Sequence, residues 1–368
     1  MSHPMPPHTT GKSHSHQNMS SKNTLRLVAW ETTRNCNLSC KHCRASATMG
    51  PYEGELDTKA SFKLLEQIAK VGKPIVILTG GEPLLRADIF DIAKFGTEKG
   101  LKMVMSPNGT LITPETAKKM VEAGIKRISI SLDGATSKIH DAFRGVPGAF
   151  KGALDGIDQA KAAGIEFQIN TTITKANLDQ IPKIFKLAED LGAVAHHIFL
   201  LVPTGRGKYI VDQAIDAKEY EETLNWFYDQ RENTSLQLKA TCAPHYYRIL
   251  RQRAKQEGKS VTFQTHGLDA VTRGCLAGTG FCFISHHGIV QPCGFLHLPC
   301  GDVTKASFVD IWKNSKEFAT LRDVNQLKGK CGICQFRKVC GGCRARAFEA
   351  TGDFLTAEPL CLYQPTTS

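Results

Sequence analysis

The feature that most constrains this chain is a group of three cysteines near its start, Cys36, Cys40 and Cys43. They follow a short apolar segment at residues 25–30 and have the spacing CxxxCxxC. Three thiolates can hold three irons of a 4Fe–4S cube and leave the fourth iron open to a small molecule. Electron-transfer clusters normally use four cysteines, so a set of three predicts chemistry at the open iron. A zinc knot or three buried thiols are the alternatives.

Composition favours a cytoplasmic metal-binding protein. The chain has 368 residues, of which 41% are hydrophobic, enough for one large domain or two ordinary ones. It has no apolar run long enough for a membrane-spanning helix, and its N-terminus lacks the apolar centre of a secretory signal. We therefore expect a cytoplasmic location and no membrane partner. Thirteen cysteines, many with CxxC spacing, then indicate metal binding rather than disulfides.

The net charge of +11 favours an anionic partner. The basic residues are scattered, and no nucleic-acid motif is present, so we expect no nucleic-acid partner. An anionic small molecule fits this charge. A solvated surface is the ordinary explanation of most of the individual charges.

Residues 25–207 alternate short apolar runs with amphipathic segments, a pattern typical of an α/β fold with parallel strands. Thr113 and Pro114 are typical of a helix N-cap and first turn, and Gly124 is typical of a helix end. Six units rather than eight predict a partial (β/α)6 barrel, in which ligands bind at the C-terminal ends of the strands. The predicted strands are residues 25–30, 74–79, 101–106, 127–132, 166–172 and 196–201.

The composition changes along the chain predict four regions. Residues 1–23 have almost no apolar content and are expected to form a disordered tail. Residues 24–212 form the partial barrel, and residues 213–265 a helical linker. Residues 266–368 form a small cysteine-rich α+β domain with short strands and one helix at 308–321.

Polar and glycine-rich motifs follow the predicted strands. Because the carboxyl ends of parallel strands meet at one edge, we expect these motifs and the three cysteines to form one site. Paired glycines let a backbone approach a ligand closely, a glutamate can accept hydrogen bonds from an ammonium, and a hydroxyl with a carboxylate suits a ribose. The motif residues are Gly80, Gly81 and Glu82 after the second strand, Asn108, Gly109 and Thr110 after the third, Ser131 and Asp133 at the fourth, Asn170 in the fifth and Arg206 after the sixth.

With these motifs, residues 25–207 resemble the radical S-adenosylmethionine (radical SAM) superfamily. The resemblance implies that the three cysteines bind a 4Fe–4S cluster and that S-adenosylmethionine chelates its open iron. Electron transfer then splits the sulfonium and forms a 5′-deoxyadenosyl radical. The implied cofactor contacts are Gly80, Gly81 and Glu82 at the amino group, Ser131 and Asp133 at the ribose, Asn170 and Arg206 at ribose and carboxylate, and His42 near the adenine.

The C-terminal cysteines resemble the SPASM module, a domain that carries auxiliary iron–sulfur clusters. Their dense run at residues 331–343 has two residues between its last two cysteines, where the family commonly has three. The resemblance implies one or two auxiliary 4Fe–4S clusters. The implied ligands are Cys275, Cys282, Cys293 and Cys343 for one, and Cys331, Cys334, Cys340 and Cys361 for the other. Cys242 can be a ligand or face the substrate, but a buried, inert thiol is the favoured interpretation of both Cys242 and Cys300.

Residues 30–44 and 340–365 resemble the members of the superfamily that modify tetrapyrroles, in particular the heme b synthases of the siroheme-dependent heme pathway. This resemblance implies oxidative decarboxylation of two propionates of iron-coproporphyrin III to vinyl groups, with a flavodoxin- or ferredoxin-type reductant. An anionic tetrapyrrole suits a basic protein, because arginine pairs well with carboxylates. The candidate carboxylate contacts are Arg44, Arg206, Arg344 and Arg346.

Three alternatives remain open. A didecarboxysiroheme deacetylase or an enzyme of heme d1 biosynthesis would carry similar motifs. A radical maturase of peptides or proteins also carries the SPASM module. A non-catalytic iron–sulfur electron carrier is disfavoured, because the three-cysteine site and the strand-end motifs would have no use in it.

Overall fold

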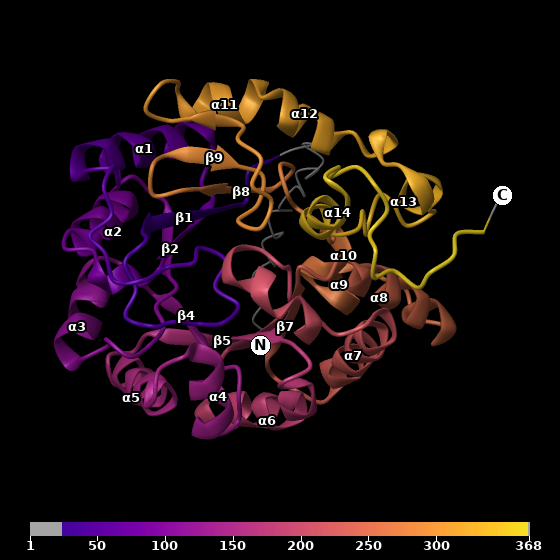
Figure 1. Cartoon of the computed structure of the whole chain (residues 1–368), viewed down its shortest axis with the longest axis horizontal. Helices are drawn as coiled ribbons and strands as arrows, with labels where there is room; N and C mark the ends of the chain where they lie inside the picture. The colour runs from indigo at the N-terminus through magenta and orange to yellow at the C-terminus, as the bar shows by residue number, and fades with distance from the viewer. Residues whose placement is uncertain (1–23, 367–368) are drawn as a thin grey trace, which may run out of the picture.

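The computed structural model describes residues 24–366, and one twisted sheet of ten strands organises them (Figure 1). The strand order is β10-β9-β8-β1-β2-β3-β4-β5-β6-β7. The eight strands from β8 to β7 run parallel, and β9 and β10 continue one edge antiparallel. The strands are β1 Leu27–Thr33, β2 Ile75–Gly80, β3 Lys102–Met105, β4 Arg127–Ser131, β5 Glu166–Ile173, β6 Ala195–Leu200, β7 Gln237–Thr241, β8 Phe281–Ile284, β9 Ile289–Gln291 and β10 Gly301–Asp302.

The six predicted strands correspond to β1 to β6, and the α/β fold with an open parallel sheet is confirmed. Two further strands join the parallel sheet, which was not predicted. The segment expected to be a helical linker contains β7, and the cysteine-rich segment, in which short strands were expected, contributes β8, which pairs with β1. The sequence of β7 alternates the apolar Leu238 and Ala240 with polar residues, but this pattern is only five residues long and lies between two helical segments. The predicted tail at residues 1–23 lies outside the described residues.

Helices cover the outer side of the curved sheet, where α1, α2, α3, α5 and α6 lie in Figure 1. The α-helices are α1 Thr58–Val71, α2 Ile89–Glu98, α3 Pro114–Glu122, α4 Ser137–Arg144, α5 Ala149–Ala162, α6 Ile181–Leu191, α7 Ala217–Asp229, α8 His245–Gln256, α9 Phe263–His266, α10 Leu268–Val271, α11 Phe308–Asn314, α12 Lys316–Arg322, α13 Gly329–Ile333 and α14 Arg344–Thr351. Short 3₁₀ helices lie at Pro83–Leu85, Leu178–Gln180, Gly205–Gln213, Gln230–Glu232 and Val324–Gln326. No helix among the described residues is long and apolar enough to cross a membrane.

The local sequence explains where these helices begin and end. Thr113 and Thr116 form a capping box at the start of α3, Pro114 occupies its first turn, and Gly124 follows its end with φ +85°. The predicted boundaries of this helix are therefore confirmed. The predicted helix at 308–321 is instead two helices, because Ser315 ends α11 and caps α12 through a hydrogen bond from the Phe318 N–H.

The two faces of the sheet differ in polarity. Positions of β4 and β5 that face the helices are apolar and fully buried, such as Ile130 and Ile169. The alternate positions are polar and only half-buried, such as Gln168 of β5, whose side chain lies 2.9 Å from that of the half-buried His197 on β6. The neighbouring His196 packs against aromatic rings of the helices instead. The inner face of the sheet is therefore polar. At the C-terminal ends of the strands, its side chains are placed to line a site.

The cysteine-rich part is built onto the β1 edge of the sheet. Val28 and Trp30 of β1 are in register with Cys282 and Ile284 of β8. On the outer side α11 packs on α1, where the Phe308 N–H donates to the Gln67 side chain. One continuous sheet thus crosses the predicted boundary between the barrel and the cysteine-rich domain.

We predict that Ile68→Ala lowers the free energy of unfolding by about 2–5 kcal/mol, because Ile68 is fully buried between α1 and the sheet. Lys63→Ala on the exposed side of the same helix is the control and changes it by no more than about 0.5 kcal/mol. Anaerobic urea titrations followed by circular dichroism measure both. Equal midpoints would show that α1 does not contribute to the core as described.

Candidate functional site

The cysteine loop, residues 34–48, follows β1 and carries Cys36, Cys40 and Cys43. The N–H groups of Leu38 and Ala47 donate to the Cys36 and Cys43 sulfurs, both at 3.4 Å. Burial raises the pKa of Cys36 to about 12, and the Cys40 thiol beside it adds to the effect. Such thiols become thiolates only when a metal cation replaces their protons. Two buried thiols and the half-buried Cys43 thiol, with backbone N–H donors to two of the three sulfurs, therefore fit an iron–sulfur cluster.

The turn after β2 holds the start of the cysteine loop by backbone contact. A Cβ on Gly80 would lie 2.2 Å from the Thr33 carbonyl oxygen, and one on Gly81 would lie 2.2 Å from that of Asn35. The Glu82 N–H donates to the same Asn35 oxygen at 2.7 Å. The two glycines were expected to let the backbone approach a ligand. In the structure they admit the backbone of the cysteine loop, and their contact with a cofactor stays a prediction.

The Glu82 carboxylate is fully buried and fixed by two backbone donors. Its Oε2 accepts from the Asn108 N–H at 2.6 Å, and its Oε1 from the Leu84 N–H at 3.1 Å. Burial raises the pKa of Glu82 to about 7, against the opposing effect of these two hydrogen bonds. The carboxylate is an electrostatic neighbour of Cys36 and keeps acceptor capacity for a cationic group.

The C-terminal end of α4 makes a second contact with the cysteine loop. Arg144 Nη1 lies 3.6 Å from the Cys40 sulfur, and the Arg144 carbonyl accepts from the Ser39 N–H at 3.1 Å. Gly145 has φ +73°, and a Cβ there would lie 2.5 Å from the Ser39 carbonyl oxygen. Arg144 is itself held by an ion pair with Asp133. The end of α4 thus places a fixed cation against one of the three cysteines.

Asp133 was expected to contact a ribose, and the structure corrects this expectation. Its carboxylate is fully buried, pairs with Arg144 and accepts from the Thr172 N–H at 2.7 Å. Burial would lower the pKa of Arg144, but the charges of Asp133 and Cys40 raise it. Asp133 therefore positions Arg144. Sequence analysis missed Arg144, because only the path of the chain through α4 brings this residue to the cysteines.

The turn after β6 makes the third contact. Arg206 Nε donates to the Cys40 carbonyl at 2.8 Å, and its Nη1 donates to the Ala47 carbonyl at 2.7 Å. Gly205 has φ +54°, and a Cβ there would lie 2.2 Å from the Arg44 carbonyl oxygen. Arg206 Nη2 is buried and has no hydrogen-bond partner among residues 24–366. This nitrogen is free to hold an anionic ligand beside the cysteine loop.

His42, which was expected near an adenine, stacks on Phe143 with ring centroids 4.5 Å apart. Burial lowers its pKa well below the usual range, so the ring is neutral, and its Nδ1 is buried without a partner in the described part of the chain. Ser131 and Asn170 are register partners on β4 and β5 and are half-buried on the inner face. The structure therefore brings the predicted cofactor residues to one edge of the sheet, apart from the buried Asp133.

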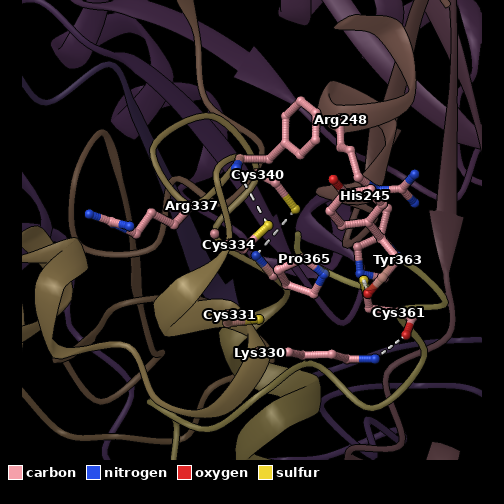
Figure 2. Close-up of a pocket in the computed structure, with 13 residues that line it drawn as sticks. His245, Arg248, Lys330, Cys331, Cys334, Arg337, Cys340, Cys361, Tyr363 and Pro365 are labelled. Atoms are coloured by element: carbon pink, nitrogen blue, oxygen red, sulfur yellow. Dashed lines mark hydrogen bonds between the residues drawn. The ribbon is translucent and has the colours of Figure 1, made fainter. Parts of the chain in front are cut away.

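Four of the C-terminal cysteines surround one pocket (Figure 2). They are the set expected for one auxiliary cluster, Cys331, Cys334, Cys340 and Cys361. Backbone N–H groups donate to the sulfurs of Cys331, Cys334 and Cys340, each at 3.4 Å. Four cysteines around one pocket, with N–H donors to three of their sulfurs, fit a cluster whose irons occupy separate corners.

The other expected set is not brought together as predicted. Cys282 lies on the face of β8 that meets the helices, where its electrostatic neighbours are Cys300 and Arg322. The next residue, Phe283, lies on the inner face, with the Arg44 guanidinium 4.3 Å above its ring. Since successive side chains of a strand point to opposite faces, Cys282 points away from the site.

Two of the four candidate arginines prove to be internal. Arg344 donates to the carbonyls of Phe354 and Thr356, and Arg346 pairs with Glu358. Both side chains are buried, so neither is available to a substrate carboxylate. This corrects their predicted role.

Arg44 pairs with Glu31 at 2.6 Å and keeps 17% of its side chain exposed beside the cysteine loop. Burial would raise the pKa of Glu31, but His286 and Arg44 lower it to about 2. Glu31 is therefore a stable anion that fixes the orientation of Arg44.

Comparison with known proteins agrees with this architecture. Residues 30–188 match the family model of the radical SAM superfamily, and residues 275–344 match the SPASM iron-sulfur cluster-binding domain. The solved structure of SuiB from Streptococcus suis bound to S-adenosylmethionine has the same fold, with a TM-score of 0.72 and 17% identity over 92% of this chain and 78% of that one. The chain belongs to the radical SAM superfamily, as a member that carries a SPASM domain.

Within the superfamily, two relatives are similar over almost their whole length. A protein of Nitratidesulfovibrio vulgaris named AdoMet-dependent heme synthase is 59% identical over 93% of both chains. One of Methanosarcina barkeri with the same name is 52% identical over 93% of this chain and 98% of its own.

We predict that Gly81→Ala removes about four irons per chain, the content of one cubane cluster, because its Cβ would displace the backbone of Asn35. Gly72→Ala at the end of α1 is the matched control, since a Cβ there meets nothing within 4 Å. Iron and sulfide analysis of anaerobically reconstituted protein measures both. Full iron content in the Gly81 variant would show that this close approach does not hold the loop.

Proposed function

We propose that this enzyme converts iron-coproporphyrin III to heme b by oxidative decarboxylation of two propionates to vinyl groups. The observation that carries the proposal is the 59% identity, over 93% of the chain, to a protein named AdoMet-dependent heme synthase. The cysteine loop supports it, since its three thiols and surrounding charges fit an iron–sulfur cluster with S-adenosylmethionine. We place residues 24–212 in the barrel, 213–265 in a linker and 266–368 in the SPASM domain.

Each residue at the cysteine loop has a role in this proposal. Cys36, Cys40 and Cys43 bind three irons of the cluster. When bound and reduced, the cluster and S-adenosylmethionine supply a radical that takes hydrogen from the substrate. Glu82 accepts hydrogen bonds from the cofactor ammonium, and Arg206 Nη2 donates to its carboxylate.

The remaining cofactor contacts come from the inner face of the sheet and from the loop. Ser131 and Asn170 offer a hydroxyl and an amide to the ribose, and His42 lies near the adenine. Arg144 adds positive charge beside Cys40 and is held in place by Asp133. Because these groups are fixed before the cofactor arrives, little reorganisation is needed on binding.

The substrate is an anionic tetrapyrrole, which suits a chain with a net charge of +11. We assign Arg44 to one of its propionates, because this guanidinium is partly exposed between the cysteine loop and the Gly294 carbonyl, 3.5 Å away. The C-terminal cysteines would hold one or two auxiliary clusters, which would supply an acceptor for the electron left after decarboxylation. A flavodoxin- or ferredoxin-type protein in the cytoplasm provides the reducing electron.

We predict that the reconstituted enzyme, given S-adenosylmethionine, a reductant and iron-coproporphyrin III, releases two molecules of carbon dioxide per porphyrin and forms heme b. Mass spectrometry follows both losses, and chromatography measures 5′-deoxyadenosine. Didecarboxysiroheme and a leader-bearing peptide are the comparison substrates. Conversion of either one, with iron-coproporphyrin III unchanged, would refute the proposal in favour of a deacetylase or a maturase.

We predict that Glu82→Gln weakens S-adenosylmethionine binding by roughly tenfold to a hundredfold, because one charged hydrogen bond is lost. Titration of the cofactor-induced change in the electron paramagnetic resonance (EPR) spectrum measures this affinity. Glu66→Gln on the exposed side of α1 is the control and leaves the affinity unchanged. An unaltered titration in the Glu82 variant would remove Glu82 from the proposed cofactor contacts.

A further inference from the structure

We infer that Cys242 is the fourth thiolate ligand of one auxiliary 4Fe–4S cluster, together with Cys275, Cys293 and Cys343. It takes the place that the sequence pattern gives to Cys282. Cys242 lies 33 residues before the segment that matches the SPASM domain, so this domain alone would not reveal it. The inference rests on the auxiliary clusters of the proposed function and specifies the ligands of one of them.

A buried polar network ties Cys242 to Cys343. The Cys242 carbonyl accepts from Arg346 Nη2 at 3.0 Å and from the Tyr220 hydroxyl at 3.2 Å. Arg346 pairs with Glu358 at 3.1 Å, and the same Glu358 oxygen accepts from the Cys343 N–H at 2.8 Å. One carboxylate and one guanidinium thus fix the backbone of both cysteines.

The segment that carries Cys275 lies directly against the Cys242 turn. A Cβ on Gly274 would lie 2.5 Å from Pro244 Cβ and 2.8 Å from the Pro244 carbonyl oxygen. The Cys275 N–H donates to the Cys340 carbonyl at 3.2 Å, within the dense cysteine run. Close packing at Gly274 therefore places Cys275 between the Cys242 turn and the run that contains Cys343.

Cys293 completes the group. Cys343 is buried in one apolar cluster with Leu296 and Leu321, and Cys242 and Cys293 are half-buried against the same cluster. The electrostatic neighbours of the Cys242 thiol include the thiols of Cys343, Cys293 and Cys275. Four cysteines from separate segments thus gather at one place, as the ligands of a cubane cluster do.

The backbone at Cys242 is unusual in a way that fits a fixed ligand. Its φ is +56°, a left-handed conformation that is uncommon for a residue other than glycine. Such a conformation persists only where the surroundings hold it, as Arg346 and Tyr220 do here through the carbonyl. Cys282, by contrast, occupies an ordinary strand position in register with Val28.

Iron analysis of paired variants tests the inference. In a full-length parent with Cys36, Cys40 and Cys43 changed to alanine, only the auxiliary clusters remain. We expect Cys242→Ala in this parent to lose about four irons and four sulfides per chain. Cys282→Ala is the matched control, because Cys282 is the cysteine that the sequence pattern puts in this place and is fully buried, and it should keep the parental content.

EPR separates loss of a ligand from loss of the fold. If the cluster survives on three cysteines, its open iron binds added cyanide, and the spectrum of Cys242→Ala, unlike that of the parent, changes with cyanide. Cys242→Ser, which differs by one atom, should shift the reduction potential of one auxiliary cluster, whereas Cys282→Ser should shift neither. Circular dichroism checks that every variant is folded.

The inference is overturned if Cys242→Ala has the parental iron content and a spectrum that cyanide does not alter. Loss of four irons in a folded Cys282→Ala chain, with Cys242→Ala unaffected, would also overturn it. The cluster count does not depend on the substrate. A chain that passes this test but leaves iron-coproporphyrin III unchanged would keep the ligand assignment and refute only the proposed function.

Discussion

The functional site depends on backbone contact between the cysteine loop and three turns at the C-terminal edge of the sheet. Gly81, Gly145 and Gly205 each lie where a Cβ would overlap a carbonyl oxygen of residues 35–44. A charged side chain lies next to each glycine, namely Glu82, Arg144 and Arg206. The loop has little regular structure of its own, so these contacts fix the cysteines. The cluster ligands are therefore in place only when β2, α4 and β6 have assembled around β1.

Buried charges connect this site to the SPASM domain. Glu31 on β1 is paired with His286, which follows β8, and with Arg44 of the cysteine loop. Isolated buried charges are costly, so this triad is stable only while all three groups are present. The Arg44 charge also opposes the burial that raises the pKa of Cys293 to about 12. The cysteine loop and Cys293 thus share one polar region at the junction of β1 and β8.

A second ion pair organises the C-terminal cysteines. Arg346 and Glu358 are both buried. Arg346 Nη2 donates to the carbonyls of Cys242 and Leu201, and Glu358 accepts from the Cys343 N–H. Arg344 and Arg346 were candidate contacts for substrate carboxylates. They are internal because their N–H groups donate to backbone carbonyls instead. The basic composition of the chain is partly structural, and Arg44 is the candidate that retains a role toward an anionic substrate.

The sequence by itself determined β1 to β6, the ends of α3, the position of the three cysteines after the first strand, and the four cysteines that surround one pocket. The strands, the helix ends and the cysteine triplet follow from local periodicity, capping and short spacing, which depend on near neighbours in the chain. The four-cysteine set, which includes the more distant Cys361, follows from the resemblance to the SPASM module. Only the tertiary structure decided that β7 and β8 extend the sheet, that Asp133 serves Arg144, and that Cys242 rather than Cys282 lies beside Cys275, Cys293 and Cys343. Each of these outcomes depends on which face of a strand a side chain occupies and on contacts between segments far apart in the chain. The spacing of residues along the sequence gives neither kind of information.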